Sequence, residues 1–585
     1  MDATGLAIEL FRLVIKTYEI FQKAIDFPES SSAIVLRLDV ELTRLQLWGK
    51  HSGANRGVLV PDLAPFEPLI DRILTRLTSL LQDSAKLKEK YGLSPANELE
   101  AGVKRPTTRS KSFDQVKGAL RAIVKTRGST SSGEQESNSK PVVTALDRVR
   151  WAISSEAKFE QLVEDIRGYT NNLNELLRES QRAPLYQDWH RAEMQIVGAV
   201  DDTSSLQLMQ EMAEGDISCQ DMLTMALRKA IAINDSSSGR KGSVQILAKQ
   251  DFDLPPDFRQ LSRCIAMYHP RSPSSFPITQ QPSYVLVEKK HYDDHISSED
   301  RATLLSRLHR LITLLNTATP DERGLLPTCL GYWSEPDDNC WCLAYRCPFL
   351  PNCTLPPQKI AGRLISAQPV SLLKLLQSSS FKPALELRIK LATTLASVLS
   401  RLYGGQWLHK GIRSHNIVFP RSPSDAYDIS APLITGFEYS RQYSETVSID
   451  IISQDFSQAV YRHPDYQGDV EARRSRYRMA YDVYSFGLLL AEIAWWVPME
   501  KTYQDVMKKR SNMGSGFYAQ HARGFMEEII RRVGKELAFR VGTPYQKVVE
   551  WCLMQGQVNT PDKELVVDFY NNVVVPLEEV SKTFQ

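Results

Sequence analysis

Two short polar segments in the second half of the chain carry residue types that could hold a substrate or a cation. Residues 409–416 read HKGIRSHN, and residues 435–438 read TGFE. Asn416 offers an amide oxygen as a candidate cation ligand. Gly411 and Gly436 have only a hydrogen as side chain, which can neither accept a proton nor ligate a cation. Any reaction that needs a carboxylate at these two positions is therefore excluded.

The two segments resemble the catalytic loop and the metal-binding loop of protein kinases. Kinases carry His-Arg-Asp followed by an Asn in the first loop and Asp-Phe-Gly in the second, because one Asp orients the substrate hydroxyl and the other holds Mg²⁺. His409 and Phe437 are kept here. The resemblance places Gly411 at the catalytic Asp and Gly436 at the metal-binding Asp. Arg413 stands at the neighbouring Lys position.

Two further matches follow in the order that kinases use. Residues 461–466, YRHPDY, are similar to the Ala-Pro-Glu segment that ends an activation loop, and residues 482–487, DVYSFG, are similar to the start of the long central helix. In kinases this Asp accepts hydrogen bonds from the catalytic-loop backbone. The resemblance implies that Asp482 has the structural role of holding the segment at His409.

The nucleotide-binding residues of a kinase are also incomplete. No glycine-rich phosphate loop is visible. Lys289 is a candidate for the strand lysine, but Lys290 or neither could face the cleft, and the following helix has no interior glutamate to pair with it. Lys289 and Asn416 are the remaining candidates for binding ATP and Mg²⁺. We expect a pseudokinase without a cofactor or metal; the alternatives are an atypical active kinase that uses Glu438, and a non-catalytic scaffold.

The segment between Phe437 and His463 corresponds to an activation loop. Phosphorylation there by an upstream kinase would add about −1.5 to −2 charge and could reorder the segment. An ordinary exposed polar loop is the alternative. The candidate hydroxyl residues are Ser440, Tyr443, Ser444, Thr446, Ser448, Ser453 and Ser457.

The length of the chain and its changes of pattern predict several domains. A chain of 585 residues exceeds what one hydrophobic core normally supports. Its net charge of +2 gives no general reason to bind nucleic acid. We expect an all-α bundle over 1–215 with a flexible insertion at about 100–140, a linker over 216–240, and an α+β two-lobed kinase-like domain over 241–580. Its small lobe would cover about 241–350 and its large lobe about 351–580.

Helices of the first domain are expected over 4–21, 33–48, 66–90 and 141–179. At 100° per residue, the charged residues of the first helix fall in an arc of about 80°, and apolar residues occupy the rest. These charged residues are Glu9, Arg12, Lys16 and Glu19.

The opening of the chain resembles the HeLo domain of fungal prion-inhibition and heterokaryon incompatibility proteins. The resemblance rests on residues 5–7 (GLA) with the apolar helix that follows, 36–40 (LRLDV) and 44–50 (RLQLWGK), and covers about 1–215. It implies membrane permeabilisation and programmed cell death, with the first helix implicated in insertion. The four charges oppose insertion of a single helix. We therefore weigh a self-associated polar pore lined by these charges against a helix packed permanently in its bundle.

The insertion is strongly basic. Residues 104–127 hold eight Lys or Arg and one Asp, and apolar residues at helical spacing make 112–125 a candidate basic amphipathic helix. Lys117, Arg121 and Lys125 are its candidate contacts to anionic membrane lipids. A solvated linker is the alternative.

Five of the eight cysteines cluster between Cys329 and Cys353. Their spacing lacks paired C-x-x-C knuckles and no His lies nearby, so buried thiols in a β-hairpin are preferred over zinc. The start of the chain lacks a basic leader and no run is apolar enough to span a membrane, so a cytoplasmic protein that joins membranes on activation is expected. The layout is analogous to that of mixed-lineage kinase domain-like proteins, in which a pseudokinase controls a membrane-attacking bundle.

Overall fold

The structure is a computed structural model. It describes residues 4–95, 110–128, 150–233, 244–270, 282–293, 295–319, 322, 324–347, 369–419, 428–437, 441–442, 455–467, 477–510, 517, 519–558 and 560–584. The chain divides into two compact units, unit 1 over Met1–Ala230 and unit 2 over Ile231–Gln585. Each unit is described by itself.

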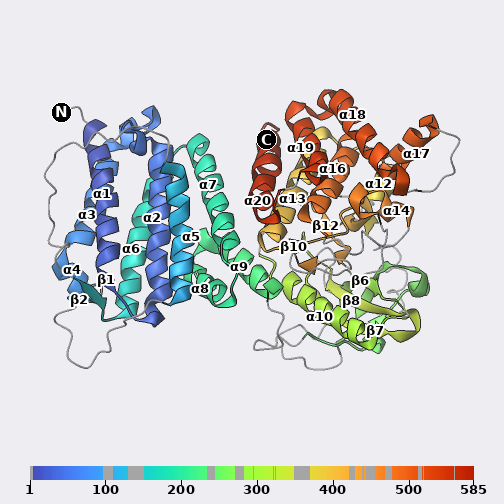
Figure 1. Cartoon of the computed structure of the whole chain (residues 1–585), viewed down its shortest axis with the longest axis horizontal. Coiled ribbons are helices and arrows are strands. Elements are labelled where there is room, and N and C mark those ends of the chain that lie inside the picture. The colour runs from blue at the N-terminus through green and yellow to red at the C-terminus, as the bar shows by residue number, and fades with distance from the viewer. Residues whose placement is uncertain are drawn as a thin grey trace. The chain divides into compact units, whose positions relative to one another are not determined.

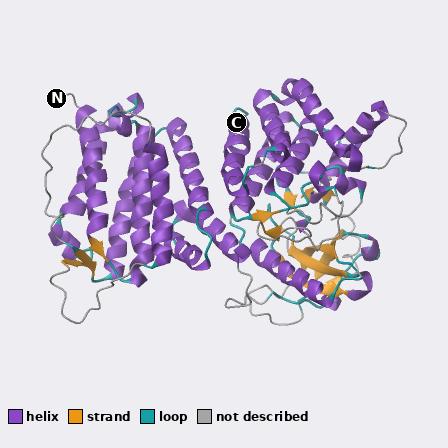
Figure 2. Cartoon of the chain, in the orientation of Figure 1, coloured by secondary structure: helices purple, strands orange, loops and turns teal. Residues whose placement is uncertain are grey.

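Unit 1 is a bundle of long helices that lie side by side, with one short sheet at its end (Figures 1 and 2). Its helices are α1 Thr4–Ala24, α2 Ser32–Ser52, α3 Glu67–Gln82, α4 Ser84–Glu89, α5 Lys111–Gly128, α6 Glu156–Glu175, α7 Glu179–Gly198, α8 Thr203–Ala213 and α9 Gln220–Ile233. Its strands are β1 Ile25–Asp26, β2 Leu93–Pro95 and β3 Trp151–Ile153, in the order β1-β3-β2.

Helix α2 lies at the centre of the bundle and packs against α5, α6, α7 and α8. The fully buried indole of Trp48 donates to the carbonyl of Leu173 in α6 at 2.9 Å. The helix ends because Gly53 adopts a left-handed φ of +86°, where a Cβ atom would lie 2.1 Å from the carbonyl oxygen of Val58. Only glycine can adopt this backbone conformation after the helix without a clash.

The prediction of a flexible insertion is wrong for the residues that form α5. Phe113, Val116 and Leu120 are buried, and the helix packs against α2, α7 and α8. Lys117 is also buried and pairs with Asp39 of α2 at 3.3 Å. The apolar face that suggested a membrane-binding helix therefore contacts protein, because α2 offers both an apolar surface and a carboxylate. Arg121 is exposed, and the side chain of Lys125 lies outside the described residues.

Two other expectations for unit 1 need correction. Trp151 and Ile153 were expected in a helix but form β3, which pairs with β1 in parallel and with β2 antiparallel. The helical pattern of the surrounding residues does not exclude a strand of three residues here, because the strands that pair with it are remote in the sequence. The predicted linker from residue 216 begins with structured chain, because a 3₁₀ turn over Ile217–Cys219 and helix α9 follow.

The charged arc of helix α1 is exposed to solvent. Glu9, Arg12, Lys16 and Glu19 are all exposed, as expected for a packed bundle. Leu6 and Leu13 are also exposed, by 53% and 41%. Among the described residues, no helix combines the length and apolar composition needed to cross a membrane.

Unit 2 begins with a five-stranded sheet in the order β4-β5-β6-β8-β7. All neighbouring strands are antiparallel. Helix α10, Ser298–Leu315, connects β6 to β7, and the hydroxyl of Ser297 caps it by accepting from the backbone N–H of Asp300. The strands are β4 Phe252–Asp253, β5 Arg263–Tyr268, β6 Ser283–His291, β7 Cys329–Glu335 and β8 Cys340–Arg346.

The remainder of unit 2 is mostly helical (Figure 2). Its helices are α12 Leu372–Gln377, α13 Leu385–Gly404, α14 Phe456–Ala459, α16 Met479–Trp495, α17 Met499–Arg510, α18 Ala522–Val541, α19 Thr543–Met554, α20 Asp562–Phe569 and α21 Val575–Lys582. Its short strands are β9 Val370–Ser371, β10 Trp407–Leu408, β11 Ile417–Phe419, β12 Leu433–Ile434 and β13 Arg441–Gln442. Helix α16 is buried along its length and forms the centre of this part.

The expected hairpin of cysteine-bearing strands is present as β7 and β8. Cys329, Cys340, Cys342 and Cys347 are buried free thiols, while Cys353 lies outside the described residues. Among the described residues, no cluster of three or more metal-ligating groups involves these cysteines.

Candidate functional site

The segment at His409 is anchored to the start of α16. The buried carboxylate of Asp482 accepts from the backbone N–H of His409 at 2.6 Å, from that of Lys410 at 2.9 Å and from the hydroxyl of Tyr477 at 2.8 Å. Burial raises the pKa of Asp482 to about 6, against the lowering effect of these three donors. The sequence predicted this contact, which ties the segment at His409 to the start of α16.

The imidazole of His409 is buried beside Phe437, with ring centroids 4.4 Å apart. Its Nδ1 accepts from the backbone N–H of Gly411 at 3.1 Å. Burial lowers the pKa of His409 to about 3. The ring is therefore neutral at physiological pH and serves as a packing element of the loop.

The two glycines meet at the side chain of Asn416. A Cβ atom on Gly411 would lie 2.8 Å from the carbonyl oxygen of Gly436. One on Gly436, whose φ is +80°, would lie 2.1 Å from Nδ2 of Asn416. The room that a carboxylate would need at either position is occupied by backbone or by this amide.

Both ends of the Asn416 amide are engaged within the protein. Its Nδ2 donates to the carbonyl of Gly411 at 2.8 Å, and its Oδ1 accepts from Arg263 of β5 at 3.0 Å. The oxygen that would have to ligate a cation therefore faces a guanidinium, which repels a divalent ion.

Arg263 and Glu288 join the sheet to these loops. They are directly paired in the β5–β6 register and form an ion pair of 2.6 Å. Arg263 also donates to the carbonyl of His415 at 3.1 Å, and Glu288 accepts from the backbone N–H of Gly436 at 3.2 Å. A largely buried ion pair thus links the sheet to the place where the two glycine segments approach it.

Lys289 lies on the opposite face of β6 from Glu288, because side chains alternate along a strand. Its ammonium donates to the carbonyl of Arg259 at 3.0 Å, lies 3.8 Å from Asp338, and sits 4.4 Å from the ring centroid of Phe258. These partners engage the ammonium of Lys289. Of the predicted nucleotide-binding pair, Asn416 is at the loop junction, and Lys289 is bound to these other groups although it lines the same cavity as Asn416.

A polar cavity of about 240 Å³ lies beside this junction. Its volume is below the roughly 300–1,000 Å³ typical of small-molecule sites. Arg413 lines it and donates to the hydroxyl of Ser457 at 3.3 Å. The lining residues are Ser262, Arg263, Glu288, Lys289, His291, Arg413, His415, Asn416, Asp455, Ser457 and Gln458.

Several predicted residues cannot be placed. Glu438 and six of the seven candidate phosphorylation residues lie outside the described residues; Ser457 is the described one. Sequence reasoning missed Arg263 and Glu288 as members of the site. The available signal was a charged residue in a largely apolar strand, Arg263 in β5 and Glu288 in β6.

The comparison with known families concerns unit 1. Residues 3–209 match the family model HeLo, described as prion-inhibition and propagation. Unit 1 thus contains a HeLo domain, as the sequence predicted. No curated protein matches the chain at a significant level.

Proposed function

We propose that this protein is a cell-death signalling protein in which a membrane-active HeLo bundle is controlled by a catalytically inactive, kinase-like unit. The family match supports the first half of this proposal. The observation that carries the second half is the loop junction, where Asn416 fills the place of the missing carboxylates and binds Arg263.

Three features support a kinase-like fold for unit 2. A sheet-bearing lobe precedes a helical lobe in the chain. Strand β6, the third of its sheet in sequence, is followed by α10, as the third strand of the small lobe is followed by a helix in kinases, although Lys289 of β6 faces away from the loop junction. Asp482 at the start of the buried helix α16 holds the loop at His409.

The same geometry argues against phosphoryl transfer. A positioned base contributes about 10²- to 10⁴-fold to such a rate, and Gly411 cannot serve as one. Unit 2 would therefore act by binding partners, among them an upstream kinase that modifies the segment between Phe437 and His463. An active nucleotide-binding enzyme is the rival. It predicts a Mg²⁺-dependent rise in melting temperature with ATP that is lost in Asn416→Ala, whereas our proposal predicts no rise.

Helix α1 is the proposed membrane contact. At 100° per residue, Leu6 and Leu13 lie within about 20° of each other, and Leu13 lies about 40° from Glu9. The exposed face of α1 is thus a charged stripe with an apolar edge. Such a face favours adsorption of α1 to a lipid surface, followed by self-association of the protein. It disfavours insertion of a single helix into the membrane.

Leakage of dye from vesicles of phosphatidylcholine and phosphatidylserine tests this proposal. The 1–233 fragment, which has its own core and ends with α9, should release dye at concentrations where the full chain does not. Leu13→Glu should abolish release. Ile217→Glu is the matched control, because Ile217 is 92% exposed and belongs to the 3₁₀ turn before α9 and not to α1.

Two results would contradict the proposal. A folded 1–233 fragment that releases no dye at any concentration would leave a non-catalytic scaffold as the better description. Equal loss of leakage in Leu13→Glu and Ile217→Glu would remove α1 as the membrane contact.

A further inference from the structure

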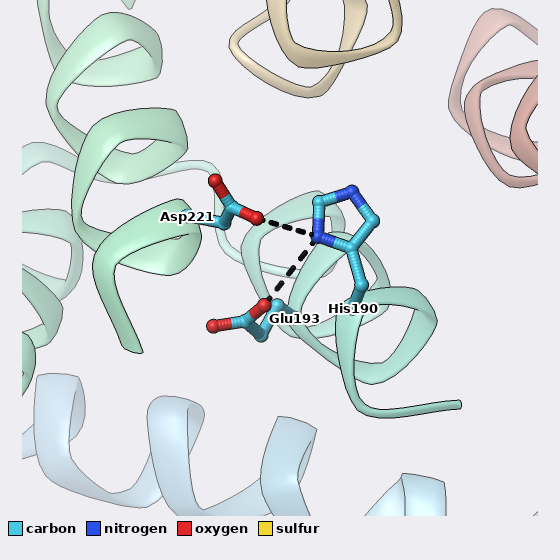
Figure 3. Close-up of side chains that lie close together, drawn as sticks. All are labelled: His190, Glu193 and Asp221. Atoms are coloured by element: carbon cyan, nitrogen blue, oxygen red, sulfur yellow. Dashed lines mark ion pairs between the residues drawn. The ribbon is translucent and has the colours of Figure 1, made fainter. Parts of the chain in front are cut away.

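A histidine and two carboxylates converge between α7 and α9 in unit 1 (Figure 3). Nδ1 of His190 lies 3.0 Å from Oδ2 of Asp221 and 3.6 Å from Oε2 of Glu193. The three ligand atoms all lie within 4.8 Å of one another, and this is the cluster of metal-ligating type found among the described residues.

The two helices hold the three side chains in place. His190 and Glu193 are three residues apart on α7, so both project from one face of that helix. Asp221 is in the first turn of α9. The indole of Trp189 donates to the carbonyl of Ser218 at 2.7 Å, which ties the turn before α9 to α7. The cluster is therefore built on regular elements with a direct cross-link beside it.

Glu193 is the unusual member. Its side chain is 3% exposed, and its Oε1 has no hydrogen-bond partner. Besides His190, the backbone of Met222 contributes a hydrogen bond to this carboxylate, so the cost of burying its charge is only partly offset within the protein. The side chains of His190 and Asp221 are 15% and 30% exposed, so an ion can reach the cluster from solvent.

We propose that His190, Glu193 and Asp221 form a binding site for a divalent transition-metal ion of the Zn²⁺ type. Zinc ligands at about 2.0–2.2 Å in tetrahedral geometry lie roughly 3.4 Å apart, which matches the two distances from His190. One imidazole nitrogen and two carboxylate oxygens leave a fourth position for water. An imidazole ligand disfavours Mg²⁺ and Ca²⁺, which prefer oxygen.

The alternative is an ion triad that needs no metal. In that triad a protonated His190 pairs with Oδ2 of Asp221 and Oε2 of Glu193. A proton on His190 would then hold the cluster together. A metal replaces this proton and binds the two carboxylate oxygens that face His190, Oε2 of Glu193 and Oδ2 of Asp221 (Figure 3). Because α9 is the last helix before unit 2, the ion would clamp the end of unit 1 to α7.

The test uses the full chain, stripped of metal with a chelator and then titrated with ZnCl₂. We expect one saturable equivalent per chain, a rise in melting temperature, and the visible absorption of a four-coordinate site with CoCl₂. Mg²⁺ should give none of these. His190→Gln and Asp221→Asn should each weaken Zn²⁺ binding by more than about 10-fold.

The control is His51→Gln. His51 lies 3.0 Å from Asp188 in the same unit, a His–carboxylate pair of similar geometry outside the cluster, and its loss should leave Zn²⁺ binding unchanged. Asp221→Asn changes a partly exposed side chain and keeps its size, so it serves if His190→Gln fails to fold without metal. Absence of saturable Zn²⁺ binding, or equal affinity in the wild type and Asp221→Asn, overturns the proposal.

Discussion

At the residue scale, the defining feature of unit 2 is the mutual fit of Gly411, Asn416 and Gly436. A glycine that merely replaced an aspartate would leave a space where the side chain had been. Here the amide of Asn416 occupies that space and is held from both sides by Gly411 and Arg263. An aspartate introduced at Gly436 would therefore collide with the amide before it could bind Mg²⁺.

We predict that Gly436→Ala destabilises unit 2 by about 1–3 kcal/mol, the usual cost of a residue held in an unfavourable backbone region. Its φ is +80°, and the new Cβ atom would lie 2.1 Å from Nδ2 of Asn416. Urea unfolding of the 231–585 fragment measures the change. Combining it with Asn416→Ala should recover the steric part of the loss.

Gly534→Ala is the control for this prediction. Gly534 is inside helix α18, where its Cβ atom would meet only the end of the flexible Glu550 side chain at 3.3 Å. Alanine there should stabilise the fragment by about 0.5–1 kcal/mol, because glycine costs that much in a helix. Equal stability of Gly436→Ala and the wild type would contradict the fit described above.

Part of this site could be predicted from sequence because its members are adjacent in the chain or fall in a recognisable order. Gly411, Asn416 and Asp482 belong to that part. Arg263 and Glu288 do not, since they meet Asn416 and Gly436 only after β5 and β6 pair in one particular register. A shift of one residue in either strand would turn its side chain to the other face and separate Arg263 from Glu288.

At the element scale, α5 is tied to the bundle by charge as well as by apolar packing. The Lys117–Asp39 pair is buried on both sides. Burial raises the pKa of Asp39, and Lys117 opposes this rise. The pair holds α5 against α2 only as long as both charges are present.

We predict that Lys117→Met destabilises the 1–233 fragment by about 3–5 kcal/mol, the cost of leaving one buried charge without its partner. Adding Asp39→Leu should recover most of this loss. Lys111→Gln is the control, since Lys111 is exposed on the same helix, and its change should stay within about 0.5 kcal/mol. A Lys117→Met fragment as stable as the control would show that α5 does not depend on the pair.

Helix positions were predictable from periodicity, but the partner of each face was not. The pattern of Phe113, Val116 and Leu120 identifies a helix with one apolar side, and this side would look the same whether it met lipid or α2. Trp151 and Ile153 were misassigned for a related reason. A strand of three residues is set by β1 and β2, which lie far from it in the sequence.

At the scale of the whole molecule, each unit has its own core, and the described residues on the two sides of residues 234–243 belong to different kinds of fold. The control of the bundle that we propose for unit 2 requires either the covalent connection or binding between the units. These two mechanisms make opposite predictions for a chain that is cut between them.

We predict that cutting the full chain at a protease site inserted between Gly239 and Arg240 releases a membrane-active bundle. The uncut protein should leave vesicles intact, and cutting should produce dye leakage at the level of the 1–233 fragment, because the connection keeps unit 2 at a high effective concentration near the bundle. The control is the same protein treated with inactivated protease. Leakage that stays low after complete cutting, and rises only when unit 2 is removed by chromatography, would instead show that unit 2 binds the bundle tightly without the connection. Leakage that is equal before and after cutting would show that unit 2 exerts no control.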